Sequence, residues 1–327
     1  MRFERAIDNI IEAPVFTSFT RLGYDVRSRL AHWTDLSSYD LTGRVVLITG
    51  ATSGIGAVTA EWMACCGASV VLLGRDRTKT EQVRDQLAAR SGNDHLDAVV
   101  ADMGDFDAVR TAAADIQRRH ARLDVLIHNA GALTASRQVA PSGIELTVAS
   151  QVVGPFLMTG LLLDRLRHSS PARVITMSSG GMYSADLEVG DLQMGRDYKG
   201  SRQYARAKRA QVTLNEMWAQ RIPATEVAFQ AMHPGWTDTP GMRAALPTFH
   251  KLVGPLLRSP QQGADTLLWL AADDHEPLAT SGGFWLDRRI RPIHKLPSTK
   301  KSDTAERRRQ LWNWCVEASG IDPNLLP

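Results

Sequence analysis

The sequence predicts an α/β protein in which one doubly wound parallel sheet lies between two layers of helices. Short apolar runs alternate with helical stretches from residue 44 to residue 286, the order expected of parallel strands joined by helical crossovers. A glycine-rich turn follows the first apolar run, and polar residues follow several later ones. The 327 residues, of which 43% are hydrophobic and 22% charged, suffice for one large core. We therefore expect a single α/β domain.

Two segments flank this domain. Residues 1–40 form an N-terminal extension whose apolar residues recur at helical spacing. These residues are Ile7, Ile10, Ile11 and Val15, with Pro14 interrupting the run. We expect an amphipathic helix that packs on the main domain, with a helix that lies on a membrane surface or binds a partner as the alternative. Residues 41–296 form the main domain, and residues 297–327 form a linker followed by a helix.

Composition gives no support for nucleic-acid binding or for a metal site. The net charge is +3 and most basic residues are dispersed, so no nucleic-acid partner is expected. The cysteines, Cys65, Cys66 and Cys315, lack the spacing of a disulfide framework or a metal site. The N-terminus lacks the apolar core of a signal peptide, and the longest apolar run, residues 152–163, is too short for a transmembrane helix. We expect a cytoplasmic protein, with peripheral membrane association through the N-terminal segment left open.

The first strand, residues 44–49, runs into a glycine-rich turn and then into a helical stretch. The turn residues that we expect to bind a cofactor are Gly50, Thr52, Ser53, Gly54, Ile55 and Gly56. Glycine lets the backbone turn tightly and approach a pyrophosphate, and the free N–H groups of the following helix attract the phosphate charge. The spacing is a variant of G-x-G-x-x-G, and its strand–turn–helix context indicates a Rossmann fold with a dinucleotide site.

The second strand, residues 69–73, ends at Gly74, Arg75 and Asp76. In a dinucleotide fold the end of this strand faces the adenosine ribose, where an acidic side chain would bind the 2′-hydroxyl of NAD. The guanidinium of Arg75 suits a 2′-phosphate instead. We therefore expect NADP (NADPH) rather than NAD, with a purely solubilising role for Arg75 as the alternative.

Four further strands also end at residues suited to a ligand site. Residues 97–101 end at Asp102, residues 123–127 precede Asn129, Ala130 and Gly131, residues 172–177 end at Ser178 and Ser179, and residues 225–232 precede Pro234, Gly235, Thr237 and Thr239. Open α/β sheets bind ligands outside the carboxyl ends of their strands. Helices are expected at 78–90, 105–120, 142–167 and 261–271, a last strand at 282–286, and a mobile lid at 240–258.

Tyr204 and Lys208 lie four residues apart in a stretch rich in helix formers, which places them on one face of a helix. A lysine ammonium beside a phenol favours the phenolate and lowers the tyrosine pKa, so that the tyrosine can exchange protons nearer neutrality. The alternative is a solvated helix face. Of the five tyrosines, only Tyr204 has a lysine four residues on.

In this order, the glycine-rich turn, Asn129-Ala130-Gly131, Ser179, the Tyr204/Lys208 pair and the 234–239 turn resemble the short-chain dehydrogenase/reductase superfamily. The resemblance implies that Tyr204 is the catalytic acid/base and that Lys208 lowers its pKa and binds the nicotinamide ribose. It also implies that Ser179, rather than Ser178, holds the substrate oxygen. Ile55, Asp102, Asn129 and Thr239 would line the cofactor. The stretches 178–182, 218–220, 232–240, 262–266 and 287–288 are similar to one branch of the superfamily, in which an N-terminal extension is also present.

One residue departs from the family pattern. Gln151 stands where the family usually has an asparagine, ahead of Gly154-Pro155-Phe156. That asparagine helps to hold a water that relays protons to the lysine, partly through its backbone carbonyl. Glutamine has a carbonyl of its own, at a shifted position, so Gln151 is a candidate catalytic residue whose relay role stays open.

The resemblance implies reversible hydride transfer between NADP(H) and an alcohol/carbonyl pair on a small molecule. Apolar residues near the expected site favour a lipophilic substrate, with ordinary core and lid packing as the alternative. They are Met182, Trp236, Met242, Leu246 and Phe249. Other hypotheses are an NADP-binding sensor or scaffold with little catalysis, and a sugar-nucleotide epimerase. Relatives pair through the helices at 142–167 and 200–221, which implies a homodimer or homotetramer.

Overall fold

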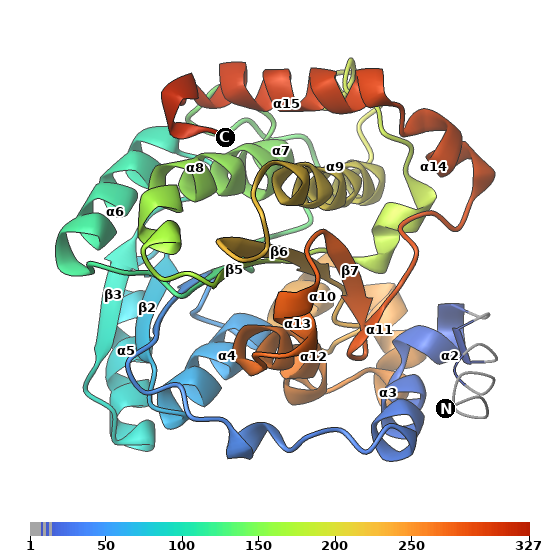
Figure 1. The fold of residues 1–327 in the computed structure, drawn as a ribbon. Coiled ribbons are helices and arrows are strands. Elements are labelled where there is room, and N and C mark those ends of the chain that lie inside the picture. Colours follow the sequence, from blue (N-terminus) through green and yellow to red (C-terminus); the bar gives the residue numbers. More distant parts are fainter. Residues whose placement is uncertain (1–7, 9–10, 13–14) are drawn as a thin grey trace.

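An eight-stranded sheet with the order β3-β2-β1-β4-β5-β6-β7-β8 forms the middle layer of the protein (Figure 1). The computed structural model describes residues 8, 11–12 and 15–327. The strands are β1 (Val45–Thr49), β2 (Ser69–Gly74), β3 (Leu96–Val100), β4 (Val125–His128), β5 (Ala172–Met177), β6 (Val227–Met232), β7 (Gly283–Leu286) and β8 (Arg289–Ile290). All neighbours pair in parallel except β7 and β8. The predicted doubly wound sheet is confirmed, and the sheet also contains a short antiparallel strand, β8, that the sequence did not predict.

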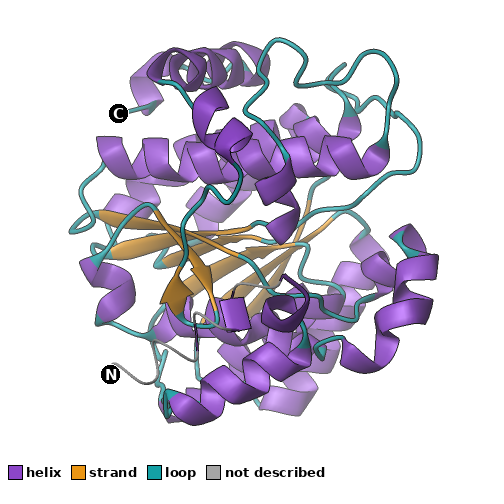
Figure 2. Cartoon of the chain, turned by 90° about the vertical axis from the view of Figure 1, so that its right-hand side faces the viewer, coloured by secondary structure: helices purple, strands orange, loops and turns teal. Residues whose placement is uncertain are grey.

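Helices cover both faces of the sheet, as Figure 2 shows from the side. One layer contains α4 (Gly54–Cys65), α5 (Arg77–Ser91) and α12 (Pro260–Ala272), and the other contains α6 (Phe106–Arg119), α8 (Gly154–Arg167) and α9 (Gly200–Arg221). Side chains of β1 alternate between the two layers: Val46 and Ile48 belong to the core under α4 and α12, and Leu47 to the core under α8 and α9. Because both faces are buried, all five residues of β1 are apolar or fully buried.

The helix expected at 142–167 is interrupted. It consists of α7 (Leu146–Val148), a π-helical turn η2 (Ala149–Val153) and α8. A Cβ atom on Gly154 would clash with the backbone carbonyl of Met103, so a glycine is needed where the two helical geometries join. The whole stretch Leu146–Arg167 is long and apolar enough to cross a membrane, which corrects the expectation from the shorter run. However, 83% of its most apolar window is buried inside the fold, as in a core helix.

The N-terminal extension is helical, as predicted, and comprises α2 (Val15–Phe19), α3 (Arg21–Leu30) and η1 (Leu36–Ser38). Ile7, Ile10 and Pro14 lie outside the described residues. The extension lies beside β7 and the short helices α10 (Pro240–Ala245) and α11 (Pro247–Val253), which occupy the segment expected as a lid (Figure 1). The further short elements are η3 (Gly180–Ser184), η4 (Gly254–Leu256), α13 (Glu276–Ala279) and η5 (Pro323–Leu325).

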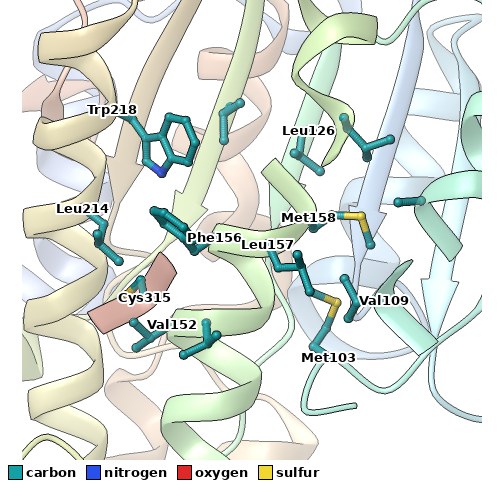
Figure 3. Packing of buried hydrophobic residues seen from close by; sticks show 14 of the residues in the cluster. Met103, Val109, Leu126, Val152, Phe156, Leu157, Met158, Leu214, Trp218 and Cys315 are labelled. Atoms are coloured by element: carbon teal, nitrogen blue, oxygen red, sulfur yellow. The ribbon is translucent and has the colours of Figure 1, made fainter. Parts of the chain in front are cut away.

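The C-terminal helix α15 (Ala305–Ser319) lies across α8 and α9 (Figure 1). Its Trp312 makes edge contacts with Phe156 of α8 and Trp218 of α9, with ring centroids 5.0 and 4.9 Å apart. The guanidinium of Arg221 stacks over the same indole at 3.9 Å. Figure 3 shows the core beneath, where Phe156 and Trp218 meet near Cys315. The segment from Pro297, expected as a linker, instead forms helix α14 (Pro297–Ser302), which is consistent with proline at the first position of a helix.

Candidate active site

The glycine-rich turn between β1 and α4 is shaped to admit a phosphate group. Gly50 and Gly54 have φ angles of +68° and +55°, which favour glycine. A Cβ on Gly56 would clash with the carbonyl of Gly50. Ser53, at the N-cap position of α4, makes no side-chain capping bond, so the N–H groups of the first turn remain available to an anion. The turn therefore fits a dinucleotide pyrophosphate.

Asn129 braces this turn from the neighbouring strand. Its side-chain amide donates to the carbonyls of Thr49 and Gly50 at 3.0 and 3.1 Å. The backbone N–H groups of Asn129 and Ala130 both donate to the Thr49 hydroxyl, at 3.0 and 3.1 Å. A Cβ on Gly50 would lie 2.8 Å from the Cα of Ala130. The β4 turn is thus locked against the glycine turn, as expected from two adjacent parallel strands.

The turn after β6 reaches the glycine-rich turn through Thr239. The side chain of Thr239 would lie 3.3 Å from a Cβ on Gly54. Thr237, in contrast, is buried, donates its hydroxyl to the carbonyl of Pro234 at 3.1 Å and packs on Gly263 of α12. Gly235 has a φ of +75° and lies against the buried guanidinium of Arg258. Of these predicted cofactor residues, Thr239 is the one whose side chain meets the glycine-rich turn.

At the end of β2, the side chains of Arg75 and Asp76 differ in exposure and in hydrogen bonding. Arg75 is exposed. The carboxylate of Asp76 accepts from the backbone N–H of Lys79 at 2.8 Å and so caps α5. Thr52 of the glycine-rich turn lies close to Gly74, where a Cβ would approach its methyl group to 2.9 Å. The end of β2 is therefore adjacent to the turn, with an exposed cation and an acid already engaged in capping.

Asp102, at the end of β3, stabilises the loop that follows it. Its carboxylate accepts from the backbone N–H of Gly104 at 2.8 Å. This turn leads to Met103, whose carbonyl lies against Gly154 at the start of α8. The structure places Asp102 at the strand end, as predicted.

The two serines after β5 point in different directions. The Ser178 hydroxyl is buried and donates to the backbone carbonyl of Lys208 at 3.2 Å. The Ser179 hydroxyl accepts from the N–H of Gly181 at 3.2 Å and is hydrogen-bonded to the phenol of Tyr204. Ser179 and Tyr204 therefore form a pair of hydroxyls able to bind one oxygen atom together.

Lys208 lies one turn behind Tyr204 on α9, but the free protein does not show the predicted effect on the tyrosine. Burial raises the pKa of Tyr204 to about 12, and the Ser179 hydrogen bond only opposes this in part. Burial lowers the pKa of Lys208 to about 7. The Lys208 ammonium donates to the carbonyl of Met177 at 2.9 Å and lies 5.2 Å from the centroid of the Tyr204 ring. The expectation of a lowered tyrosine pKa is thus corrected, because burial disfavours the charged form of each group and the Ser179 hydrogen bond does not compensate for it at Tyr204.

Gln151 lies in the π-helical turn η2 and is fully buried. Its amide nitrogen donates to the carbonyl of Ala132 at 2.6 Å, and its carboxamide packs against Gly131. Its backbone carbonyl accepts from the side chain of Gln211 at 2.6 Å. Gln151 thus supports the loop after β4, and its backbone carbonyl already has one donor.

A small cavity of about 30 Å³ lies behind Gln151, between α8, α9 and the sheet. Three buried atoms in its walls have no hydrogen-bond partner within the described chain: Nδ1 of His128 and Oε1 of Gln151 and of Gln211. The Nε2 atom of His128 shares a hydrogen bond with the Thr159 hydroxyl at 2.8 Å, and burial lowers the pKa of His128 to about 3. His128 and Gln211 were not predicted from the sequence, because buried single polar residues leave no periodic signal.

In the described part of the chain, no group of three or more His, Cys, Asp or Glu residues could hold a metal ion. The positive-φ glycines, the braced strand ends and the Ser179/Tyr204/Lys208 group together define a dinucleotide-binding α/β protein with a candidate acid/base site. The model of the short chain dehydrogenase family matches residues 44–248. The chain belongs to this family and is an oxidoreductase that uses a nicotinamide cofactor and acts on CH–OH and C=O groups.

The chain is similar to several known proteins along most of its length. It is 38% identical to human dehydrogenase/reductase SDR family member 12 over 298 residues, covering 90% of this chain and 92% of that protein. It is 32% identical to bovine retinol dehydrogenase 12 over 314 residues, covering 94% and 97%. A short chain dehydrogenase from Shigella flexneri 2a, solved in complex with NADP, shares the fold with a TM-score of 0.60 and 25% identity, covering 77% of this chain and all of that one. The predicted similarity to one branch of the superfamily is confirmed by the first of these.

Proposed function

We propose that the chain is an NADP(H)-dependent oxidoreductase that transfers hydride between the nicotinamide and an alcohol/carbonyl pair on a lipophilic substrate. The observation that carries the proposal is the paired hydroxyls of Ser179 and Tyr204, with Lys208 one helical turn away. A bound nicotinamide would supply or accept the hydride. The glycine-rich turn would hold its pyrophosphate, and Arg75 the 2′-phosphate.

In the reducing direction, the side chains of Ser179, Tyr204 and Lys208 have different roles. Ser179 and Tyr204 donate hydrogen bonds to the carbonyl oxygen, which polarises the carbonyl and favours charge on the oxygen in the transition state. Tyr204 then gives its proton to that oxygen. With its pKa near 7, Lys208 is partly protonated at neutral pH. Its positive charge lowers the free energy of the phenolate that remains.

Two features support the finer parts of the proposal. Asp76 is engaged in capping α5 while Arg75 is exposed, which favours a 2′-phosphate over a 2′-hydroxyl. Trp236 and Phe249 make an edge contact with ring centroids 5.0 Å apart, on the turn after β6 and on α11. One relative, retinol dehydrogenase 12, bears the name of a lipophilic alcohol.

The test is oxidation of NADPH and of NADH by the purified protein with aldehydes and ketones of rising lipophilicity. Tyr204→Phe keeps the ring and removes the acid, so turnover should fall by about two to four orders of magnitude. Full turnover in this variant would contradict the assignment of Tyr204. Tight NADPH binding without turnover on any carbonyl would favour the alternative of a cofactor-binding sensor.

A further inference from the structure

The N-terminal extension contacts the residue next to Ser179. Phe19 at the end of α2 is 3% exposed, and its ring lies so close to Gly180 that a Cβ there would clash with it. The same ring makes an edge contact with His233, with centroids 4.3 Å apart. A residue far upstream of the first strand therefore borders the backbone that presents the substrate-binding hydroxyl.

Trp236 connects the extension to the turn that crosses the site. Its backbone N–H donates to the carbonyl of Phe19 at 2.7 Å. The turn begins at the end of β6, where Met232 is in register with Met177 of β5, and it ends at Thr239 beside the glycine-rich turn. Trp236 thus lies between the strand that carries Ser179 and the proposed phosphate site.

An aromatic row extends outward from this point. Phe16 makes an edge contact with Trp236 at 5.7 Å, and Trp236 makes another with Phe249 of α11 at 5.0 Å. Phe16 is 45% exposed, although its ring is fixed against an indole. Large aromatic side chains gain the most free energy from burial. Apolar and aromatic side chains with a few polar groups nearby are typical of a ligand pocket, and this row is joined through Trp236 to Phe19, which packs on Gly180 beside Ser179.

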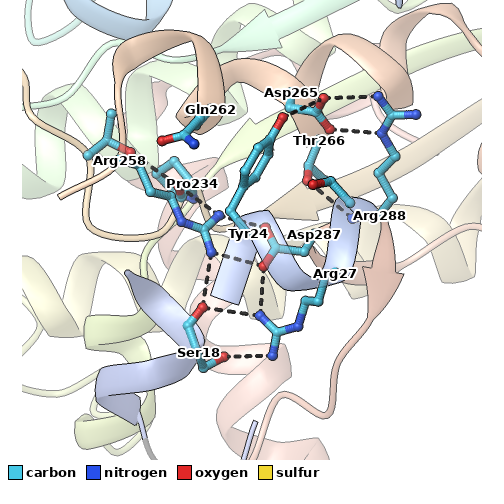
Figure 4. Close-up of polar contacts among 12 residues, drawn as sticks. Ser18, Tyr24, Arg27, Pro234, Arg258, Gln262, Asp265, Thr266, Asp287 and Arg288 are labelled. Carbon is cyan, nitrogen blue, oxygen red and sulfur yellow. Dashed lines mark hydrogen bonds and ion pairs between the residues drawn. The ribbon is translucent and has the colours of Figure 1, made fainter. Parts of the chain in front are cut away.

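Hydrogen bonds and ion pairs hold the N-terminal extension in a fixed position, as is required of a segment that lines a substrate site. Arg258 donates to the backbone carbonyls of Ser18 and Thr20, at 3.0 and 3.3 Å. Arg27 donates to the carbonyl of Ser18 at 3.1 Å. Both guanidinium groups pair with the buried carboxylate of Asp287, at 2.6 Å each (Figure 4). The backbone between the two phenylalanines is therefore positioned by charged hydrogen bonds, which reduces the entropy lost on ligand binding.

We propose that the N-terminal extension is part of the substrate site: Phe16, together with Trp236 and Phe249, contacts the apolar ring system of the substrate on the side away from its carbonyl. The inference rests on the proposed carbonyl reduction and specifies its substrate class, a carbonyl compound with a bulky, ring-containing apolar body. Phe16 is then a specificity-determining residue that belongs to no motif of the dinucleotide fold.

Phe16→Ala tests the proposal against Leu22→Ala, a matched control on α3 that removes another exposed apolar side chain, 51% exposed. The substrates are benzaldehyde, 2-naphthaldehyde and pyrene-1-carbaldehyde, with NADPH, and alcohol formation is followed by chromatography. For Phe16→Ala we expect KM to rise about five- to tenfold for the pyrene compound, since part of an aromatic contact is lost, and at most about twofold for benzaldehyde. Leu22→Ala should match the unmodified protein, and thermal melting of all three should agree.

Equal KM changes for small and large aldehydes, or equal behaviour of the two variants, would overturn the proposal. A binding measurement distinguishes failure of the proposed substrate site from failure of the proposed reductase activity. If the unmodified protein reduces none of the aldehydes, the dissociation constant of pyrene-1-carbaldehyde is measured on NADP⁺-loaded protein by quenching of tryptophan fluorescence. Weaker binding by Phe16→Ala alone would support the pocket without the reaction, whereas identical constants in both variants would exclude it.

Discussion

The ammonium group of Lys208 lies 5.2 Å from the ring centroid of Tyr204 and donates to the carbonyl of Met177. Its folded-state pKa, lowered by burial from 10.5 to about 7, means that the charge disappears as pH rises through neutrality. Stability changes in the opposite direction: the cost of burying charged Lys208 is complete below pH 7, and it shrinks as pH rises from about 7 toward 10.5, because there the unfolded state binds more protons. The charge of the proposed catalytic pair is therefore sensitive to pH in the physiological range.

The first prediction concerns the pH profile. The kcat/KM for NADPH, which reports ionisations of the free protein, should fall as pH rises through about 7, because Lys208 loses its proton there. Steady-state rates between pH 5.5 and 9 measure this. In Lys208→Arg the charge persists at all these pH values, so the fall should vanish from the remaining activity. A flat profile in the unmodified protein would contradict the assignment.

The second prediction concerns cofactor choice. Arg75→Ala should raise KM for NADPH about tenfold or more and leave KM for NADH almost unchanged, because a charge-assisted contact to a phosphate contributes about 1.5–3 kcal/mol. Arg77→Ala is the control, since Arg77 is an exposed arginine nearby that pairs with Glu81 within α5. Equal losses with both cofactors would remove Arg75 from the phosphate site.

The third prediction distinguishes two roles for the Gln151 side chain: supporting the loop after β4, or relaying protons to Lys208. Gln151→Leu removes the amide bond to Ala132 at similar volume, and we expect KM for NADPH to rise roughly three- to tenfold with kcat little changed. A fall in kcat with KM unchanged would instead place the side chain in the relay. Gln117→Leu is the control, because the Gln117 amide also donates to a backbone carbonyl, that of Leu161, away from the site.

The fourth prediction concerns the N-terminal anchor. Arg27→Met removes one partner of the buried Asp287 and should lower the free energy of unfolding by about 3 kcal/mol in urea titrations. Arg29→Met, exposed on the same helix, should change it by less than about 0.5 kcal/mol. Indistinguishable unfolding curves would show that Arg258 alone suffices for Asp287.

This anchor also has a pH dependence. Burial would raise the pKa of Asp8 and Asp287, but the adjacent arginines outweigh it and hold both below their ordinary value. A carboxyl with a depressed folded-state pKa contributes stability that is complete above its unfolded pKa, about 4, and is lost as pH falls below it. The Arg27→Met effect should therefore shrink below pH 4.

The fifth prediction concerns assembly. Helices α8 and α9, through which pairing was expected, are covered by α15 of the same chain, with Trp312 between Phe156 and Trp218. We expect the protein to remain a monomer of 35.9 kDa by light scattering at micromolar concentration. A mass of two or four chains would require another contact surface or displacement of α15.

The sequence predicted the parallel strands well, because they leave local signals, and the same kind of signal led to the candidate site residues, whose roles stay a prediction. Buried parallel strands such as β5 are continuous apolar runs, and the glycine-rich turn has a required spacing. The π-helical turn around Gln151 and the pKa of Tyr204 depend on tertiary surroundings. The docking of Phe19 on Gly180 likewise joins distant residues without any repeat in the sequence, so only the structure shows it.

The ion pair between Arg27 and Asp287 joins residues 260 positions apart, and this separation fixes an order of events during synthesis. The N-terminal extension leaves the ribosome before the sheet does, yet the charged residues that hold it, Arg258 and Asp287, are translated only after most of the sheet. Until then the Arg27 guanidinium and the apolar rings of the extension stay in solvent. The entropy lost by closing so long a loop is offset only by contacts to residues that have not yet been synthesised. The extension precedes the sheet in the chain, yet its ion pair to Asp287 beside β7 can form only after β7 has been synthesised.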